Sequence, residues 1–242
     1  MTALDSDTLP QGEAAYRQLR ADIVSCRLAP GQRLTERGLS ARTGFGVASI
    51  REALTRLDHE RLVRTLPRKG YQVEPLTIKA VDDLFQFWGA VGPELVRLGI
   101  IGATAEEIER AAAGFSELKD VVSEDGPTRE IALRSVEISR RTFRVLAEAT
   151  RNEYFISTYT RVDGELSRVW TLVTDSELLQ PGGPFLDLDQ WPGTVSRRDS
   201  AAAAALARQY IQEAHHRVLR TLARWPSVIT TEVVPVGKKP DA

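Results

Sequence analysis

The chain has 242 residues, of which 42% are hydrophobic and 27% are charged, and its formal net charge is -1. This is the composition of an ordinary globular protein, and no apolar stretch approaches the roughly 20 residues that would span a bilayer. The length exceeds the usual single-domain size of about 100 to 150 residues, so we expect two domains, and a charge near zero argues against a general binder of polyanions.

The first residues and the cysteine content indicate the compartment. The opening sequence MTALDSDTLPQGEAA lacks the basic start and the apolar run of a signal peptide. Cys26 is the single cysteine, so an internal disulfide is excluded. We therefore expect a cytoplasmic protein with no membrane partner.

A helical pattern opens the chain. Tyr16, Leu19, Ile23 and Val24 are apolar residues at helical spacing, and the run stops at the turn pair Pro30-Gly31. This spacing predicts a first helix that ends before the turn.

Two shorter helices are predicted next. Thr35 is suited to cap a second helix that runs to about Arg42, and Thr43-Gly44 ends it. A third helix is predicted from Val47 to Asp58. Two short helices in this order are typical of a helix-turn-helix, in which the later helix enters the major groove of DNA.

A strand-turn-strand pattern follows the third helix. The segments LVRTL (62–66) and YQV (71–73) are strand-like, and the turn Pro67-Arg68-Lys69-Gly70 carries two positive charges at its tip. This order predicts a winged helix-turn-helix DNA-binding domain over residues 1–75. These residues hold 12 Lys and Arg against 9 Asp and Glu (net +3), whereas the other 167 hold 20 against 24 (net -4).

The remaining chain is predicted to be helical. Proline in Glu74-Pro75 disfavours helix in the residue before it, and helical periodicity begins at Ile78. A capping box at Thr104–Glu107 opens the second helix of this part. The helices are predicted at about 78–100, 104–122, 128–150, 153–175 and 199–224.

Two stretches of the second part are not predicted to be helical. The segment 178–199 is too rich in glycine and proline for a helix, and 227–236 is predicted to be an extended tail. The fold class is therefore mainly α, with an N-terminal winged helix-turn-helix domain (1–75) and a C-terminal all-α helical bundle (78–242).

Particular segments resemble a known family. The sequences LAPGQRL, IREALTRLDHERLV and LPRKGYQV resemble the winged-helix domain of the GntR family of bacterial transcription regulators. FRVLAEATRN (Phe143–Asn152) resembles part of the all-helical FCD effector domain of its FadR-like subfamily. The resemblance implies a homodimer that binds a double-stranded DNA operator and releases it when the helical domain binds a small metabolite, commonly a carboxylic acid. We expect a ligand-responsive repressor.

The sequence does not predict an enzyme. It has no phosphate-binding glycine loop, nucleophile elbow or paired-carboxylate motif. An open alternative is a metabolite-binding helical protein whose DNA-reading domain is weakened or lost. Departures from the family at Gly38, Val47 and Arg61 favour that alternative.

The resemblance implies particular DNA contacts. Arg37 and Arg51 match family positions that touch DNA, and arginine can pair bidentately with phosphate or guanine. The other interpretation is that both are helix charges, Arg37 beside Glu36 and Arg51 beside Glu52. The full predicted set is Arg37, Gly46, Val47, Ala48, Ser49, Arg51, Arg68, Lys69 and Gly70.

The front of the third helix departs from the family pattern. The family usually shows Gly-Val-Ser-Arg-Thr-Pro-Val-Arg, whereas residues 44–51 here are GFGVASIR. Val47 therefore replaces the usual base-reading arginine, and an aliphatic side chain can pack against a thymine methyl group. We predict a shifted operator sequence.

The effector site is predicted from a second departure from the family pattern, at the positions that hold a metal ion in many effector domains of the family. Such domains often hold a divalent metal through an aspartate, a histidine four residues later and two further histidines, but the corresponding positions here are Arg140, Arg144 and, for one later histidine, near Tyr210. We therefore expect no metal and no other cofactor. Two guanidiniums one turn apart would repel unless an anion lay between them, which predicts a carboxylate or phosphate bound directly. Trp88 and Tyr210 would form an aromatic wall.

One interpretation competes with this effector site. Glu137, Arg141, Arg144, Glu148 and Arg151 are spaced as on a solvent-exposed helix face with ordinary ion pairs. The predicted effector-binding residues are Trp88, Arg140, Arg144 and Tyr210.

Overall fold

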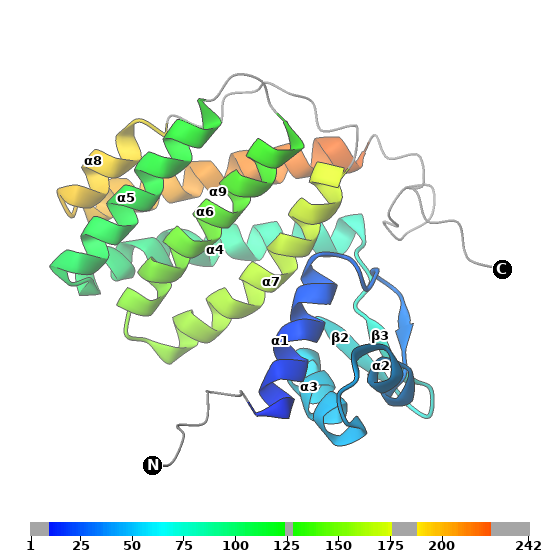
Figure 1. Ribbon diagram of the computed structural model, residues 1–242. Coiled ribbons are helices and arrows are strands. Elements are labelled where there is room, and N and C mark those ends of the chain that lie inside the picture. Colours follow the sequence, from blue (N-terminus) through cyan, green and yellow to red (C-terminus); the bar gives the residue numbers. More distant parts are fainter. Residues whose placement is uncertain (1–9, 124–127, 176–187, 224–242) are drawn as a thin grey trace, which may run out of the picture. The chain divides into compact units, whose positions relative to one another are not determined.

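The computed structural model describes residues 10–123, 128–175 and 188–223. The chain divides into two compact units, Met1–Pro75 and Leu76–Ala242 (Figure 1). The described residues are mainly helical, which confirms the predicted fold class.

The first unit combines helices with a small sheet. Its elements are α1 (Gln11–Val24), β1 (Arg33–Leu34), α2 (Glu36–Thr43), α3 (Val47–His59), β2 (Val63–Leu66) and β3 (Gly70–Val73). The three helices and the hairpin confirm the predicted elements, and the short strand β1 was not predicted. The Thr35 hydroxyl accepts a hydrogen bond from the Gly38 N–H at 3.1 Å, so Thr35 caps α2 as expected.

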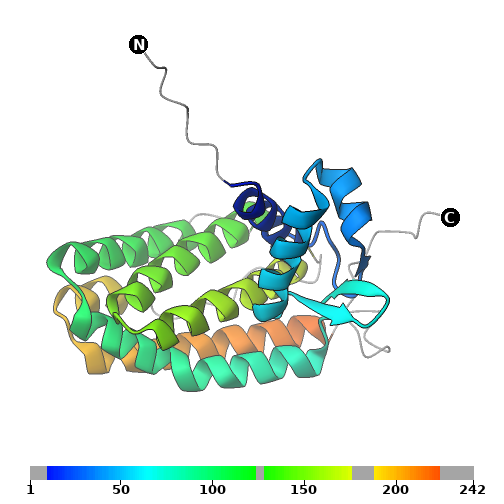
Figure 2. The same ribbon diagram turned by 90° about the horizontal axis from the view of Figure 1, so that it is seen from below.

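The sheet of the first unit is antiparallel in the order β1-β3-β2, and Leu66 pairs with Gly70 at the hairpin end. Figure 2 shows the β2–β3 hairpin, in cyan, as a projecting loop of this unit. Gly70 has φ of +85°, and a Cβ there would lie 2.6 Å from the Leu34 carbonyl oxygen. Only glycine fits this position, because it allows both the turn and the approach of β1.

Apolar side chains of α1 and α3 form the core of the first unit. They are buried on one face of each helix, which is the arrangement that removes most apolar surface from water. The central members are Ala15, Leu19, Ile23, Ile50, Ala53, Leu54 and Leu57.

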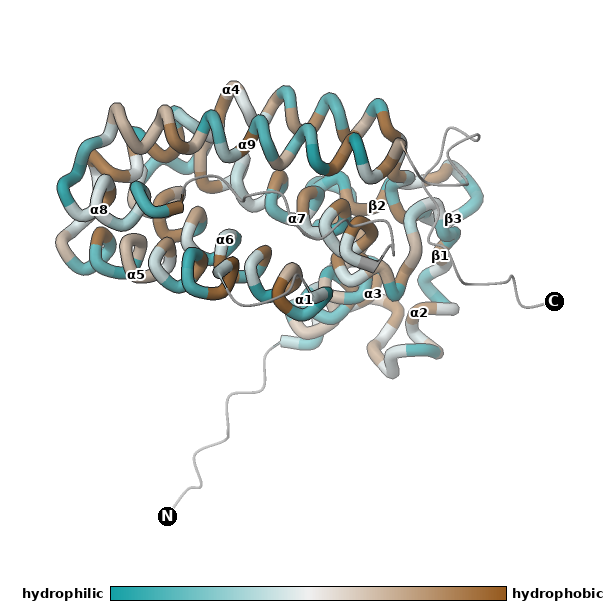
Figure 3. The backbone as a smooth tube through the Cα atoms, turned by 90° about the horizontal axis from the view of Figure 1, so that it is seen from above, coloured by the Kyte–Doolittle hydropathy of each residue, from teal (hydrophilic) through white to brown (hydrophobic). Residues whose placement is uncertain are grey.

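The second unit is a helical bundle. Its elements are α4 (Ile78–Gly102), α5 (Ala105–Val122), α6 (Arg129–Ala149), α7 (Glu153–Asp175), α8 (Gln190–Ser196) and α9 (Ser200–Leu222). The five long helices confirm the predicted segments. Figure 3 shows apolar and polar segments alternating along α4 and α9, as expected for helices with one apolar face. Among the described residues, the helices are too short or too polar to cross a bilayer.

The prediction that 178–199 contains no helix is wrong at α8. Pro192 lies in the first turn, where a backbone N–H has no helical partner, so proline costs little there. Trp191 is buried and stacks on Phe115 with ring centroids 4.1 Å apart. Burial of this ring favours the helix despite the local composition. Residues 178–187 and the predicted tail at 227–236 lie outside the described residues.

Helices α4 and α6 approach each other closely. A Cβ on Gly99 would lie 2.3 Å from the Leu146 carbonyl oxygen, and one on Gly102 would lie 2.4 Å from that of Ala149. Real Cβ atoms do not approach backbone oxygens this closely, so these two positions of α4 admit only glycine at this crossing.

Candidate functional site

The front of α3 exposes the residues that were predicted to read DNA. Gly46 forms the N-cap without a side-chain hydrogen bond, and Ala48 is exposed while Ser49 is half-buried. Val47 is 38% exposed, and it is one of a few large apolar side chains exposed among the described residues. Arg51 is exposed one turn further along. An exposed valine at this position can contact a thymine methyl group in the major groove.

Arg51 forms an ion pair with Glu36 of α2. Its Nε donates to Glu36 Oε1 and its Nη2 to Oε2, both at 2.8 Å. The hydrogen bond from Arg51 lowers the pKa of the Glu36 carboxyl below its usual value. The alternative from the sequence paired Arg51 with Glu52 and Arg37 with Glu36; the structure instead links Arg51 to Glu36, and Arg37 is exposed.

The hairpin between β2 and β3 carries two exposed cations at its tip. Arg68 and Lys69 are exposed, and the Lys69 N–H donates to the Leu66 carbonyl oxygen at 2.9 Å. Arg68 has φ of +63°, in the left-handed region that costs a non-glycine residue about 1 kcal/mol. The turn therefore holds both charges at the end of the hairpin, a geometry that suits phosphate contact.

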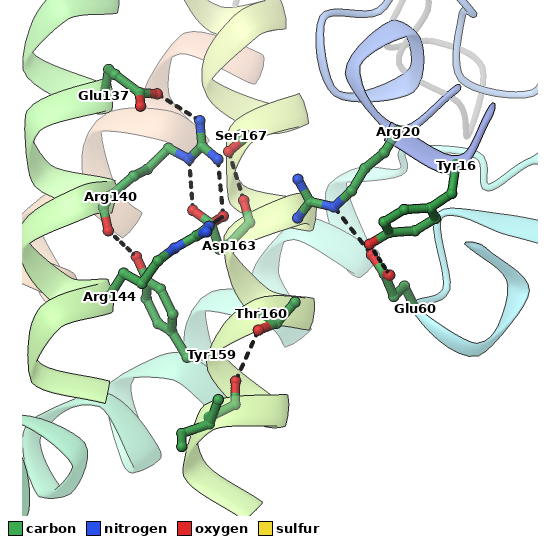
Figure 4. Close-up of polar contacts among 11 residues, drawn as sticks. Tyr16, Arg20, Glu60, Glu137, Arg140, Arg144, Tyr159, Thr160, Asp163 and Ser167 are labelled. Atoms are coloured by element: carbon green, nitrogen blue, oxygen red, sulfur yellow. Dashed lines mark hydrogen bonds and ion pairs between the residues drawn. The ribbon is translucent and has the colours of Figure 1, made fainter. Parts of the chain in front are cut away.

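Polar contacts of α1 fix the C-terminal end of α3. The Tyr16 hydroxyl donates to Glu60 Oε1 at 2.5 Å, and Arg20 Nε donates to Glu60 Oε2 at 3.2 Å (Figure 4). Arg56 lies over the Tyr16 ring, 3.7 Å from its centroid, and donates to Glu13 at 2.7 Å. These contacts hold the helix that carries Val47 and Arg51 on a fixed support.

The Tyr16 hydroxyl is expected to lose its proton at a higher pH than an ordinary tyrosine. Burial, and then the hydrogen bond to Glu60, raise the pKa of Tyr16 from 10.0 to about 12. Because the folded-state pKa is the higher one, the stabilisation is complete below pH 10 and is lost as the pH rises towards 12. Linkage sets an upper limit of about 2.7 kcal/mol, and solvent screening of this half-buried group reduces the expected effect to about 1 kcal/mol.

The measurement is a tyrosinate absorbance titration of the full chain and of Tyr16→Phe. The difference between the two curves should show one group with a midpoint near pH 12. A midpoint near 10 would contradict the short contact with Glu60. The variant should also lose less stability than the wild type between these pH values.

A cavity of about 80 Å³ lies inside the helical unit. Its walls come from α4, α6, α7 and α9, and they include three of the four predicted effector residues: Trp88, Arg140 and Tyr210. The fourth, Arg144, is directed to Asp163 and is half exposed. The structure therefore brings the predicted residues of three helices to one cavity.

Asp163 of α7 lies between the two arginines (Figure 4). Arg140 donates from Nε to Asp163 Oδ1 at 2.6 Å and from Nη2 to Oδ2 at 2.9 Å, and Arg144 Nη2 donates to Oδ2 at 3.1 Å. Arg140 Nη1 also donates to Glu137 at 2.7 Å. The Asp163 side chain is fully buried, so the chain itself supplies the anion that two adjacent guanidiniums require.

Aromatic rings form the apolar wall of the cavity. Trp88 lies 6.1 Å from Phe143 and 5.9 Å from Tyr159, and Phe143 lies 5.9 Å from Tyr210, measured between ring centroids. The Tyr159 hydroxyl donates to the Arg140 carbonyl oxygen at 2.6 Å. Burial raises the pKa of Tyr159 well above its ordinary value and also raises that of Tyr210. Both phenols are therefore neutral at physiological pH.

Several hydroxyl groups line the cavity, together with the Arg217 side chain. Ser135, Ser167 and Thr174 each donate to a backbone carbonyl one turn earlier, so each oxygen keeps lone pairs for a ligand donor. Ser139 and the Tyr210 hydroxyl are 3.0 Å apart and share one hydrogen bond, which leaves one of their two O–H groups available to donate. Within the described ranges, His, Cys, Asp and Glu side chains do not gather in threes as a metal site requires.

Comparison with known proteins identifies the first unit. Residues 11–73 match the family model of the bacterial regulatory proteins, gntR family. The chain carries a GntR-family helix-turn-helix domain.

Two curated relatives match part of the chain. The uncharacterized HTH-type transcriptional regulator BphR of Paraburkholderia xenovorans (strain LB400) is 34% identical over 106 residues, 44% of this chain and 43% of that protein. The HTH-type transcriptional repressor GlaR of Escherichia coli (strain K12) is 35% identical over 85 residues, 35% of this chain and 39% of that protein. The matched part thus spans less than half the length of these relatives.

Solved structures show the same fold over most of the chain. A GntR protein from Rhodococcus sp. RHA1 has a TM-score of 0.64 at 19% identity, covering 87% of this chain and 98% of that one. E. coli McbR/YncC has a TM-score of 0.65 at 12% identity, covering 88% of this chain and 99% of that one. Both likenesses are likenesses of fold, and they extend over both units of the chain.

Sequence reasoning missed Asp163, which holds Arg140 and Arg144, and it missed the pairing of Glu36 with Arg51. Asp163 follows Tyr159 and precedes Ser167 at four-residue spacing, so all three lie on one face of α7. An acidic residue on a helix face that otherwise carries uncharged residues was the available signal. Glu36 gave no comparable signal, because the contact with Arg51 depends on how α2 packs on α3 in the GntR domain.

Proposed function

We propose that the protein is a DNA-binding transcription regulator whose GntR domain reads an operator and whose helical unit binds a small metabolite that weakens this binding. One observation carries the proposal: the supported helix α3 exposes Val47 and Arg51 at its front, in a unit that matches the gntR family. An exposed apolar side chain beside an arginine fork suits the base edges of a major groove. The cations at the tip of the hairpin suit the adjacent phosphates.

The sign of regulation and the assembly belong to the same proposal. The relatives GlaR and RspR of E. coli (strain K12) are transcriptional repressors, which supports repression here. A homodimer would place two copies of α3 on two half-sites of a near-palindrome, because the symmetry of the site mirrors that of the protein. A protein built in this way has no need of enzymatic chemistry.

The cavity supports the ligand part of the proposal. It lies among four helices and combines aromatic walls with a few polar groups, as small-molecule sites do. The expectation of a carboxylate effector rested on an anion between Arg140 and Arg144, and Asp163 already occupies that position. We therefore propose a small ligand held by rings and hydroxyls, without requiring that it be an acid.

A second candidate function follows from the departures in the GntR domain. Arg61 adopts φ of +58° just after α3, where the family favours glycine, and Val47 cannot hydrogen-bond guanine. Both features favour a metabolite-binding helical protein whose DNA-reading domain is weakened.

A gel-shift assay separates the two candidates. The full chain is titrated against its own upstream region and against scrambled DNA of equal length, at near-physiological salt, since low salt strengthens phosphate binding to any sequence. A regulator should prefer the upstream DNA by a factor of about 1,000 or more. Equal affinity for the two DNAs would favour the second candidate. Repeating the assay with compounds that raise the melting temperature of the protein tests the ligand part, because a true effector should release the DNA.

A further inference from the structure

We propose that Glu36 is a positioning residue that restricts which DNA sequences Arg51 can read. The inference rests on the proposed function and names a specificity-determining residue of the same surface. Its basis is an ion pair between two helices of the GntR domain, in which the acidic partner is the more buried one.

The geometry leaves one edge of the Arg51 guanidinium available. Glu36 takes Nε and Nη2 at 2.8 Å each, which is the side edge of the fork. The outer edge, formed by Nη1 and the second N–H of Nη2, still has a pair of parallel donors. That pair matches the two acceptors, O6 and N7, of a guanine in the major groove.

Glu36 is the fixed member of the pair. It is the first residue of α2, directly after the N-cap Thr35, and its side chain is 23% exposed against 63% for Arg51. The positive end of the α2 dipole favours a carboxylate at this position. Arg51 has a long and flexible side chain, so the carboxylate determines where the guanidinium is held.

Two physical consequences follow for DNA reading. A held guanidinium cannot rotate towards whichever phosphate is nearest, and the adjacent negative charge weakens its attraction to phosphates in general. Both effects lower affinity for random DNA more than for a site that presents guanine at the right place. Residues 47–50 at the front of α3 are Val, Ala, Ser and Ile, so Arg51 is the residue of this segment that can form a bidentate contact with a base.

The test compares Glu36→Gln with the wild type in the full chain. Dissociation constants are measured at one salt concentration for the upstream DNA and for scrambled DNA, and circular dichroism melting verifies that the variant is folded. We expect tighter binding to scrambled DNA, weaker binding to the upstream DNA, and a specificity ratio that falls roughly tenfold. A ratio equal to that of the wild type would overturn the inference.

A control variant and a second background separate positioning from simple charge removal. Glu52→Gln removes the same charge from the residue next to Arg51, but the Glu52 carboxylate packs against Gly12 of α1, so its specificity ratio should not change. In an Arg51→Lys background there is no fork for Glu36 to hold, and Glu36→Gln should then leave the ratio unchanged. If Glu36→Gln still lowers the specificity ratio when residue 51 is lysine, the positioning role of Glu36 is overturned.

The outcomes also distinguish this inference from the proposed function. If the wild type has no preference for its upstream DNA, the proposed function fails and the inference fails with it. If the wild type has a preference that Glu36→Gln retains in full, only the positioning role of Glu36 fails.

Discussion

Replacement of Asp163 by asparagine is expected to lower the free energy of unfolding of the helical unit by about 3 kcal/mol. The Asp163 side chain is fully buried and accepts hydrogen bonds from both Arg140 and Arg144. Asparagine keeps the shape but removes the charge, and its amide group cannot accept all three hydrogen bonds. The Arg140 guanidinium, whose side chain is 24% exposed, would lose its main counterion away from bulk water.

Tryptophan fluorescence during denaturant unfolding measures the free energy of unfolding of the helical unit. The four tryptophans of the chain all follow residue 75, so their emission reports the helical unit. Glu137→Gln is the matched control, because Glu137 pairs with the same arginine at 2.7 Å but is 64% exposed. We expect that control to cost less than about 1 kcal/mol. If Asp163→Asn and Glu137→Gln lower the free energy of unfolding equally, burial of the Asp163 carboxylate does not explain the loss of stability.

A double variant examines the cause of the loss. Arg140→Met combined with Asp163→Asn removes both charges of the closest pair, and it should be more stable than Asp163→Asn alone. If the double variant is the less stable of the two, the loss in the single variant comes from packing and not from an uncompensated guanidinium.

Arg51→Ala is expected to remove most of the preference for operator DNA. An arginine fork that reads a base contributes about 1 to 3 kcal/mol of discrimination, and the proposed homodimer loses it in both half-sites. The specificity ratio should therefore fall by a factor of about 30 or more. The fold should be unaffected, because Arg51 is exposed and its pair with Glu36 is a surface ion pair.

The same competition gel shift measures the loss, at several salt concentrations. Arg110→Ala is the control, since Arg110 is an exposed arginine of α5 and its loss changes the net charge equally. If Arg51 contacts only phosphate, both DNAs should lose affinity to a similar extent and the salt dependence should become shallower. That result would assign base reading to other residues of α3.

The long helices were predictable from the sequence because they are amphipathic, and several of them begin at residues whose side chains cap them. Thr104 and Glu107 form the expected capping box, and Thr35 caps α2. Helix α8 was missed because burial of the Trp191 ring among other aromatic rings, a tertiary effect, favours it against its local composition. Strand β1 was missed because two residues show no periodicity, and its pairing depends on Gly70 being glycine.

Only part of the candidate site was predictable, because its ion pairs form between residues of different helices. Trp88, Arg140 and Tyr210 were assigned through family positions, and they lie on one cavity. The counterions Asp163 and Glu36 come from neighbouring helices, so their contacts depend on tertiary packing that local patterns do not contain.

The glycines of α4 limit how the cavity can enlarge. With no side chain between them and the carbonyl groups of α6, α4 and α6 cannot slide past each other without a backbone collision. Of the other two walls, α9 also packs closely on α4, since a Cβ on Gly92 would lie 2.6 Å from Ile211 Cδ1. The remaining wall, α7, is linked to α6 through the ion pairs of Asp163 with Arg140 and Arg144, so loss of these pairs would weaken the attachment of α7 to the rest of the cavity wall.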